Sequence, residues 1–232
     1  MRLSRYNMNI VTTAEQLEKM KRDWDRRALE NARYYVATGN ENWTDDDFFA
    51  SGERAVAEDI LTDMTNVCQG KHPKDMRVLE IGCGAARITR ALSELFGEVH
   101  AVDVSGEMVA LAQKALHDRP WAHVYQNSGM DLRVVPDDRP FDFAYSNIVF
   151  QHIPSREVIE TYVMEVHRLL RPGALFKFQV QGGGSRNAPD DTWHGVSFNE
   201  REANEMAARC GFELRHQYGA GNQYYWLWYF KS

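Results

Sequence analysis

From about Met76 onward, short apolar runs alternate with stretches that carry apolar residues at three- and four-residue spacing. The apolar runs predict β-strands and the amphipathic stretches predict helices. Strands connected through helices form a parallel sheet that is covered on both faces. The predicted strands are Arg77–Ile81, Val99–Val102, His123–Gln126, Phe141–Ser146 and Ala174–Val180, and the helices are Ala86–Phe96, Gly106–His117 and Ser155–Leu170.

The C-terminal part of the chain has a different pattern. A last helix ends at Gly211, and two further apolar runs follow at Phe212–Tyr218 and Tyr224–Phe230. Gly219 and Gly221 lie between these runs, which predicts an antiparallel hairpin. The complete pattern therefore predicts a mostly parallel, doubly wound sheet of seven strands with an antiparallel C-terminal hairpin.

Two helices are predicted before the alternating region. Thr13 and Gln16 have the spacing of a capping box, and apolar positions at helical spacing continue to about Tyr35. A second helix follows with Ser51 as its expected N-cap, and Gly70 ends it. We expect residues 1–70 to form a helical cap or lid beside a main domain of residues 71–232.

Length, composition and charge restrict the class of protein. A chain of 232 residues with 44% hydrophobic residues is long enough for one sizeable core, and its net charge of −6 disfavours DNA binding. The three cysteines match neither a disulfide framework nor a metal-ligand spacing. No apolar run has the length of a membrane span or of a signal peptide, which favours a cytoplasmic protein. The sequence does not indicate an oligomeric state.

The stretch Val78–Leu92 carries the most functional information. It reads as a strand that ends in Glu80, then a tight turn with Gly82 and Gly84, then a helix. This arrangement lets the backbone approach a nucleoside-containing ligand closely. Asp103 ends the next predicted strand, about twenty residues further on, where a carboxylate can accept hydrogen bonds from both ribose hydroxyls. The spacing predicts an adenosine-type cofactor, and a dinucleotide remains an alternative.

Several segments together resemble the class I methyltransferases that depend on S-adenosyl-L-methionine (SAM). The resemblance rests on the segments VLEIGCG, FDFAYSNIVFQHIP and LRPGALF and on Asp103. It spans about Met76 to Gln181. Glu80 also disfavours NAD, because its charge would lie beside a pyrophosphate. The resemblance implies a Rossmann-like fold and SAM as the cofactor. The sequence contains no Asp-rich metal arrangement, so a metal-free mechanism is expected.

The resemblance also implies which residues hold SAM. The usual acid near the adenine amino group is replaced here by Ser128, with Asp131 further along, and either could contact that amino group. We expect the backbone N–H of Gly129 or Met130 to meet the ring and the Met130 thioether to pack on one face of it. Met108 is expected either to cover the other face of the ring or to belong to the core. The complete cofactor-binding set is Glu80, Gly82, Cys83, Gly84, Asp103, Val104, Met108, Ser128, Gly129, Met130, Ser146 and Asn147.

His152 is the candidate general base, because it follows the fourth strand at the expected mouth of the substrate site. A structural role at the start of the next helix is the competing interpretation. Aromatic and polar residues that could cover the substrate are Tyr34, Tyr35, Phe49, Gln179 and Trp193, although ordinary core packing would also explain the aromatic ones.

The sequence thus predicts an enzyme that transfers a methyl group from SAM to an oxygen, nitrogen or carbon of a small molecule, without a metal. An Asn/Asp-Pro-Pro-Tyr/Phe motif is missing after the fourth strand, which disfavours methylation of nucleic-acid bases. The alternatives are a protein or RNA methyltransferase and a catalytically silent SAM-binding module that recruits a partner.

Overall fold

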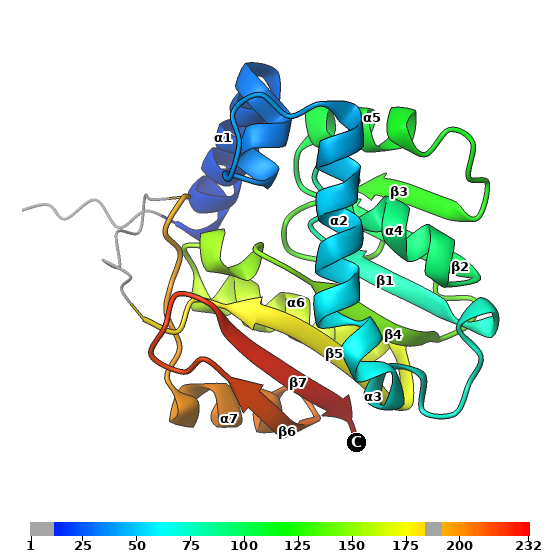
Figure 1. Cartoon of the computed structure of the whole chain (residues 1–232). Coiled ribbons are helices and arrows are strands. Elements are labelled where there is room, and N and C mark those ends of the chain that lie inside the picture. The colour runs from blue at the N-terminus through cyan, green and yellow to red at the C-terminus, as the bar shows by residue number, and fades with distance from the viewer. Residues whose placement is uncertain (1–11, 184–191) are drawn as a thin grey trace, which may run out of the picture.

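The structure, a computed structural model, describes residues 12–183 and 192–232. Within these ranges, seven strands form one sheet in the order β3-β2-β1-β4-β5-β7-β6 (Figure 1). Strands β1 to β5 are parallel, whereas β7 runs antiparallel to both β5 and β6, which confirms the predicted fold. The strands are β1 (Arg77–Ile81), β2 (Glu98–Asp103), β3 (Ala122–Gln126), β4 (Phe141–Ser146), β5 (Leu170–Val180), β6 (Phe212–Tyr218) and β7 (Tyr225–Lys231).

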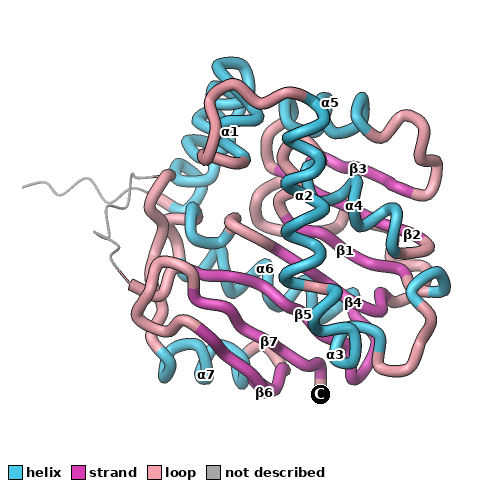
Figure 2. The backbone as a smooth tube through the Cα atoms, in the orientation of Figure 1, coloured by secondary structure: helices cyan, strands magenta, loops and turns pink. Residues whose placement is uncertain are grey.

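Helices cover both faces of this sheet (Figure 2). One face carries α2 (Asp45–Asp59), α3 (Met64–Cys68), α4 (Arg87–Leu95) and α5 (Gly106–Ala115), and the other carries α6 (Arg156–Leu169) and α7 (Glu200–Arg209). Short 3-10 turns lie at Leu61–Asp63, Pro73–Asp75 and Phe150–His152. Because both faces are covered, every residue of β1 and β4 is buried, and this is why apolar residues do not alternate with exposed polar ones in these strands.

Two helix starts differ from the sequence-based expectation. The capping box of α1 (Thr13–Val36) is formed by Thr12 and Glu15, one residue before the predicted pair. Helix α2 begins at Asp45 with Thr44 as its N-cap, so Ser51 lies inside the helix rather than at its start. The acidic first turn of α2 is favourable beside the positive end of the helix dipole.

Strand β5 also begins earlier than expected, directly after α6. Leu170 already pairs with Phe141, and the register then shifts before Leu175 pairs with Phe143. Gly173 lies in this irregular part with a φ of +76°, a conformation that glycine adopts without strain. The residues just before the predicted strand Ala174–Val180 therefore form an irregular first part of the strand itself.

Helix α1 lies beside the carboxyl ends of the parallel strands, and Figure 1 shows it at the end of the sheet near α5. Its Met20 is 3% exposed and belongs to the same core cluster as Ile81 and Val102, which lie at the ends of β1 and β2. The helix is interrupted at Asn31, whose side-chain oxygen accepts a hydrogen bond from the backbone N–H of Tyr34. None of the described helices is long and apolar enough to cross a lipid bilayer.

Candidate active site

A pocket lies where the carboxyl ends of β1, β2 and β4 meet α1. Ligands of doubly wound sheets bind at this position, beside the point where the strand order reverses. The residues that line the pocket are Met20, Trp24, Tyr35, Val36, Glu80, Ile81, Gly82, Cys83, Gly84, Arg87, Ile88, Val102, Asp103, Val104, Met108, Asn127, Asn147, Ile148, Val149, His152, Ile153 and Tyr162.

The pocket brings together most of the predicted site residues from strand ends that are far apart in sequence. The predicted residues that line it are Tyr35, Glu80, Gly82, Cys83, Gly84, Asp103, Val104, Met108, Asn147 and His152. Those that do not are Tyr34, Phe49, Ser128, Gly129, Met130, Ser146, Gln179 and Trp193. Two residues of this second group nevertheless contact the wall of the pocket: Trp193 packs on His152, and Gln179 forms a hydrogen bond with Ile148.

The glycine turn after β1 has the geometry that the sequence predicted. Gly82 and Gly84 have φ values of +77° and +51°, which favour glycine. A Cβ atom on Gly82 would lie 2.2 Å from a methyl group of Val149, and one on Gly84 would lie 2.6 Å from a methyl group of Val36. Only glycine therefore leaves space between this loop and the facing walls of the pocket.

Asp103 connects the end of β2 to this turn. One carboxylate oxygen accepts a hydrogen bond from the backbone N–H of Gly84, and the other accepts one from the backbone N–H of Ser105, both at 2.9 Å. Ser105 caps α5 and donates its hydroxyl to Asp25 of α1 at 2.6 Å. Burial raises the pKa of Asp103 to about 6. The carboxylate is thus fixed in orientation at the floor of the pocket.

Two buried groups of opposite charge lie at the other side of the turn. Glu80 is 3% exposed and its Oε2 has no hydrogen-bond partner among the described residues. Arg87 is 8% exposed, donates Nη1 to the carbonyl of Ser51 at 3.2 Å, and has no partner for Nε within the same ranges. Buried charged groups with unused hydrogen-bonding atoms are costly. An α-amino acid carries an ammonium and a carboxylate, which together would satisfy this pair.

The pH dependence of folding should report the burial of Glu80. Burial raises the pKa of its carboxyl to about 7, whereas the unfolded chain has the ordinary value of 4.5. The folded state then holds more protons between pH 5 and 7, so stability falls as the pH rises through this window. We expect urea unfolding to show that the free energy of unfolding falls by about 2 kcal/mol more in wild type than in Glu80→Gln between pH 5 and pH 7. An equal loss in both proteins would contradict the buried acid.

The predicted base, His152, is 5% exposed and lies among aromatic rings. Its ring centroid is 5.3 Å from that of Trp24 and 5.0 Å from that of Trp193. Nδ1 lies 2.6 Å from the backbone oxygen of Trp193, which can only accept, so Nδ1 carries the proton. Nε2 is then the basic nitrogen, and it lies 3.3 Å from the side-chain amide nitrogen of Gln151.

Gln179 does not line the pocket but forms hydrogen bonds with the segment after β4 that carries Ile148 and Gln151. It is fully buried, donates Nε2 to Gln151 Oε1 at 2.8 Å, and accepts a hydrogen bond from the backbone N–H of Ile148 at 3.1 Å. Ile148 has a φ of +58°, so this hydrogen bond helps to hold an unusual backbone conformation in the pocket wall. The predicted substrate contact of Gln179 is therefore replaced by a structural one.

Arg27 of α1 joins the aromatic group around His152. Its guanidinium lies 4.7 Å from the ring centre of Trp24 and 5.2 Å from that of Trp193, at cation–π distance. It also donates to the backbone oxygen and to the hydroxyl of Thr192, both at 3.1 Å. These contacts tie α1 to the segment after β5 and place Trp24 beside His152.

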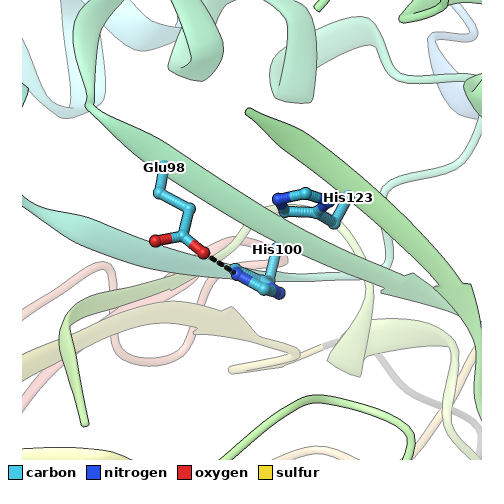
Figure 3. Close-up of side chains that lie close together, drawn as sticks. All are labelled: Glu98, His100 and His123. Carbon is cyan, nitrogen blue, oxygen red and sulfur yellow. Dashed lines mark hydrogen bonds and ion pairs between the residues drawn. The ribbon is translucent and has the colours of Figure 1, made fainter. Parts of the chain in front are cut away.

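A second cluster of ionisable groups lies at the opposite ends of β2 and β3, away from the pocket (Figure 3). Glu98, His100 and His123 have side-chain atoms within 4.8 Å of one another. His100 donates Nε2 to Glu98 at 2.7 Å, and its Nδ1 lies 3.0 Å from the hydroxyl of Tyr125. The buried Arg77 lies 3.5 Å from the same Glu98 oxygen and already supplies the positive charge. We therefore assign no metal to this cluster.

Sequence reasoning missed several residues of the pocket wall. Arg87 carried a signal, because it is a charged residue on the first turn of the helix that directly follows the glycine turn. Tyr162 and Asn127 carried none, since only the folded chain brings them together across 35 residues of sequence. Trp24 lies at one of the helically spaced apolar positions of α1, and the structure shows that it packs against the core and also lines the pocket.

Comparisons with known proteins agree with this geometry. Residues 78–173 match the family model described as a methyltransferase domain. The chain is 33% identical over 147 residues to malonyl-[acyl-carrier protein] O-methyltransferase of Salmonella typhimurium, a match that covers 60% of this chain and 55% of that protein. The chain thus spans about half the length of this curated relative.

Two solved structures show the same fold. DhpI in complex with SAH superimposes with a TM-score of 0.63 at 22% identity, covering 94% of this chain and 98% of DhpI. Magnesium protoporphyrin IX methyltransferase of Synechocystis, solved with bound SAH, gives a TM-score of 0.66 at 14% identity and covers 94% and 100%. Together with the matched domain, these similarities support the assignment of the chain to the class I SAM-dependent methyltransferase family.

Proposed function

We propose that this protein transfers a methyl group from SAM to an oxygen, nitrogen or carbon atom of a small-molecule acceptor, without a metal. The observation that carries the proposal is the pair Glu80 and Arg87, which are buried beside the glycine turn with unused hydrogen-bonding atoms. The methionine part of SAM is an α-amino acid, so its ammonium suits Glu80 and its carboxylate suits Arg87. Asp103 would hold the ribose, one strand away.

The same pair suggests how the pH affects binding. The ammonium of the methionine part is attracted only to the ionised form of Glu80. Because the pKa of this carboxyl is about 7, affinity for the cofactor is expected to rise as the pH passes through 7.

When bound, SAM supplies a methyl group on a positively charged sulfur, which is already a strong electrophile. The chain has to align the acceptor with that methyl group and to exclude water. Trp24 and Tyr35 of α1 and Val149 after β4 provide apolar surface on the side of the pocket where the acceptor would enter. His152 Nε2 would accept a proton where the acceptor keeps one at neutral pH.

We further propose that residues 1–70 act as the cap of the site and residues 71–232 as the SAM-binding domain. The support comes from the described part of the cap. Met20, Trp24, Tyr35 and Val36 of α1 line the pocket, and Asp25 accepts a hydrogen bond from Ser105 at the start of α5. The first eleven residues lie outside the described ranges.

A small acceptor is favoured over a macromolecule because α1 covers the pocket and leaves little room for a large substrate. Two of the relatives are named for acting on small or carried molecules, namely malonyl-[acyl-carrier protein] and magnesium protoporphyrin IX. The first name keeps open an acceptor that is attached to a carrier protein. A protein or RNA substrate and a silent SAM-binding role are the alternatives.

Radiolabel transfer tests the proposal. The purified protein is incubated with methyl-labelled SAM, with and without EDTA, and with a cell extract that has been divided into a metabolite fraction and a macromolecule fraction. We expect label in the metabolite fraction and none with Asp103→Ala. Label only in protein or RNA would favour a macromolecular substrate, and loss of transfer on adding EDTA would contradict the metal-free mechanism. SAM binding without any transfer would favour the silent module.

A further inference from the structure

Aromatic rings from three separate segments gather at the side of the pocket formed by α1. Trp24 and Tyr35 of α1 and His152 after β4 all line the pocket. Trp193 packs against all three of them, with ring centroids 6.3 Å from Trp24, 5.9 Å from Tyr35 and 5.0 Å from His152. These four rings form one continuous surface, which we call the aromatic wall.

The aromatic wall offers ring surface to a ligand. Trp24 and Tyr35 are only partly buried, so part of each ring remains accessible from the pocket. The hydroxyl of Tyr35 donates to the Glu30 carboxylate at 2.9 Å, so the polar end of this side chain is already engaged. Aromatic rings pack well against other flat rings, either edge to face or with an offset. The aromatic wall therefore matches a planar aromatic acceptor.

The charges beside the aromatic wall disfavour a cationic acceptor. Aromatic rings can bind cations, but the guanidinium of Arg27 already lies 4.7 Å from the ring centre of Trp24 and 5.2 Å from that of Trp193. Within residues 12–183 and 192–232, the carboxylates that line the pocket are Glu80 and Asp103, and the proposed cofactor uses both. An ammonium group at the aromatic wall would thus lie close to a like charge.

His152 distinguishes a hydroxyl from a carboxylate. Its Nδ1 carries the proton, because it lies 2.6 Å from the backbone oxygen of Trp193, and Nε2 therefore has a lone pair. This nitrogen can accept a hydrogen bond from a hydroxyl, whereas an ionised carboxylate has no hydrogen to donate. A phenol has a pKa of about 10 and keeps its proton at neutral pH, so its methylation benefits from a base at this position.

We infer that the methyl acceptor is a planar phenol that packs against the aromatic wall and is methylated on its hydroxyl oxygen. This inference rests on the proposed methyltransferase function. As the phenol oxygen forms its bond to the methyl carbon, the carbon–sulfur bond breaks and its electron pair stays on sulfur. The phenol proton passes to His152 Nε2 and from there to water. The products are an aryl methyl ether and S-adenosylhomocysteine.

The test uses a panel of phenols with one to three fused rings. Each phenol has two partners with the same ring skeleton: the fully saturated alcohol, which is not planar, and the aromatic compound with an aminomethyl group in place of the hydroxyl, which is a cation at pH 7. Calorimetry measures the binding of each compound to protein saturated with S-adenosylhomocysteine. We expect the phenol that binds best to bind at least about 10-fold more tightly than both of its partners. The same phenol should receive label from methyl-labelled SAM.

Variants locate this preference in the aromatic wall. In Trp24→Leu, the preference of the best phenol over its saturated partner should fall to about threefold or less. The matched control is Trp121→Leu, which removes a tryptophan that is 42% exposed and does not line the pocket. This control should keep the wild-type preference. If Trp24→Leu does not fold, Tyr35→Leu takes its place in the comparison.

Each outcome has a distinct meaning. If no phenol of the panel binds wild type more tightly than its saturated partner, the inference is overturned without any variant. Tighter binding of the cationic partners overturns it as well, and so does a folded wall variant that keeps the wild-type preference. Failure to bind S-adenosylhomocysteine would instead contradict the proposed function itself. Binding of that compound with label transfer only to non-phenolic metabolites would contradict the phenol alone.

Discussion

Replacing Asp103 with alanine should weaken the binding of S-adenosylhomocysteine by roughly 10²- to 10³-fold, measured by calorimetry. Two ribose hydroxyls would donate to one partly buried carboxylate, and hydrogen bonds to a charged group contribute about 1.5–3 kcal/mol each. The carboxylate is already held in place by Gly84 and Ser105, so little ordering remains to be done when the ligand binds.

The structural contacts of Asp103 require a matched control. Asp103→Asn preserves shape and one side-chain oxygen, so the loop can keep part of its hydrogen bonding while the charge is lost. We expect this variant to lose less affinity than the alanine variant and to unfold at nearly the wild-type temperature. When the 2′-deoxy analogue of S-adenosylhomocysteine is used as the ligand, the difference in affinity between wild type and Asp103→Ala should become smaller. An alanine variant that binds the complete ligand within threefold of wild type would show that the ribose lies elsewhere.

The parallel sheet and the positions of its strand ends could be predicted from sequence for a clear reason. Buried strands read as apolar runs, and polar residues placed just after such runs converge at one edge of the sheet. Glu80 is the last residue but one of β1, Asp103 is the last residue of β2 and His152 follows β4, and all three line the pocket. Local sequence was sufficient for these residues because their positions depend only on the strand and its end.

The wall contributed by α1 could not be predicted in the same way. The helical spacing showed that Met20 and Trp24 face an apolar surface, but not that this surface includes the ends of β1 and β2. That depends on how α1 packs, which is fixed by distant contacts such as Asp25 with Ser105 and Arg27 with Thr192. No periodicity within α1 encodes these partners.

The positions of the residues after β3 could not be predicted for a different physical reason. Neighbouring residues at the end of a strand point to opposite sides, so Asn127 and Ser128 cannot occupy the same environment. The family pattern placed the acid at the position of Ser128, whereas in the fold Ser128 is exposed and Asn127 is buried in the pocket wall. The choice between the two depends on the tilt of the chain after β3, which a motif does not specify.

His152 has the largest expected effect on the chemical step. For an acceptor whose hydroxyl keeps its proton at neutral pH, His152→Ala should lower kcat by roughly 10²- to 10⁴-fold, the usual contribution of a positioned general base. Nδ1 is held by the Trp193 backbone oxygen, so Nε2 is the nitrogen that can accept the proton. The acceptor found by radiolabel transfer is the substrate for this measurement.

If His152 had only a structural role, the results would be different. Its ring packs between Trp24 and Trp193, so its loss would then loosen the pocket. We therefore expect the alanine variant to bind S-adenosylhomocysteine as tightly as wild type, and we expect added imidazole to restore part of kcat. His152→Gln keeps hydrogen bonding but has no basic nitrogen, so it should remain as slow as the alanine variant. If the glutamine variant turns over at the wild-type rate, His152 positions the loop and a different group, or the bulk solvent, takes the proton.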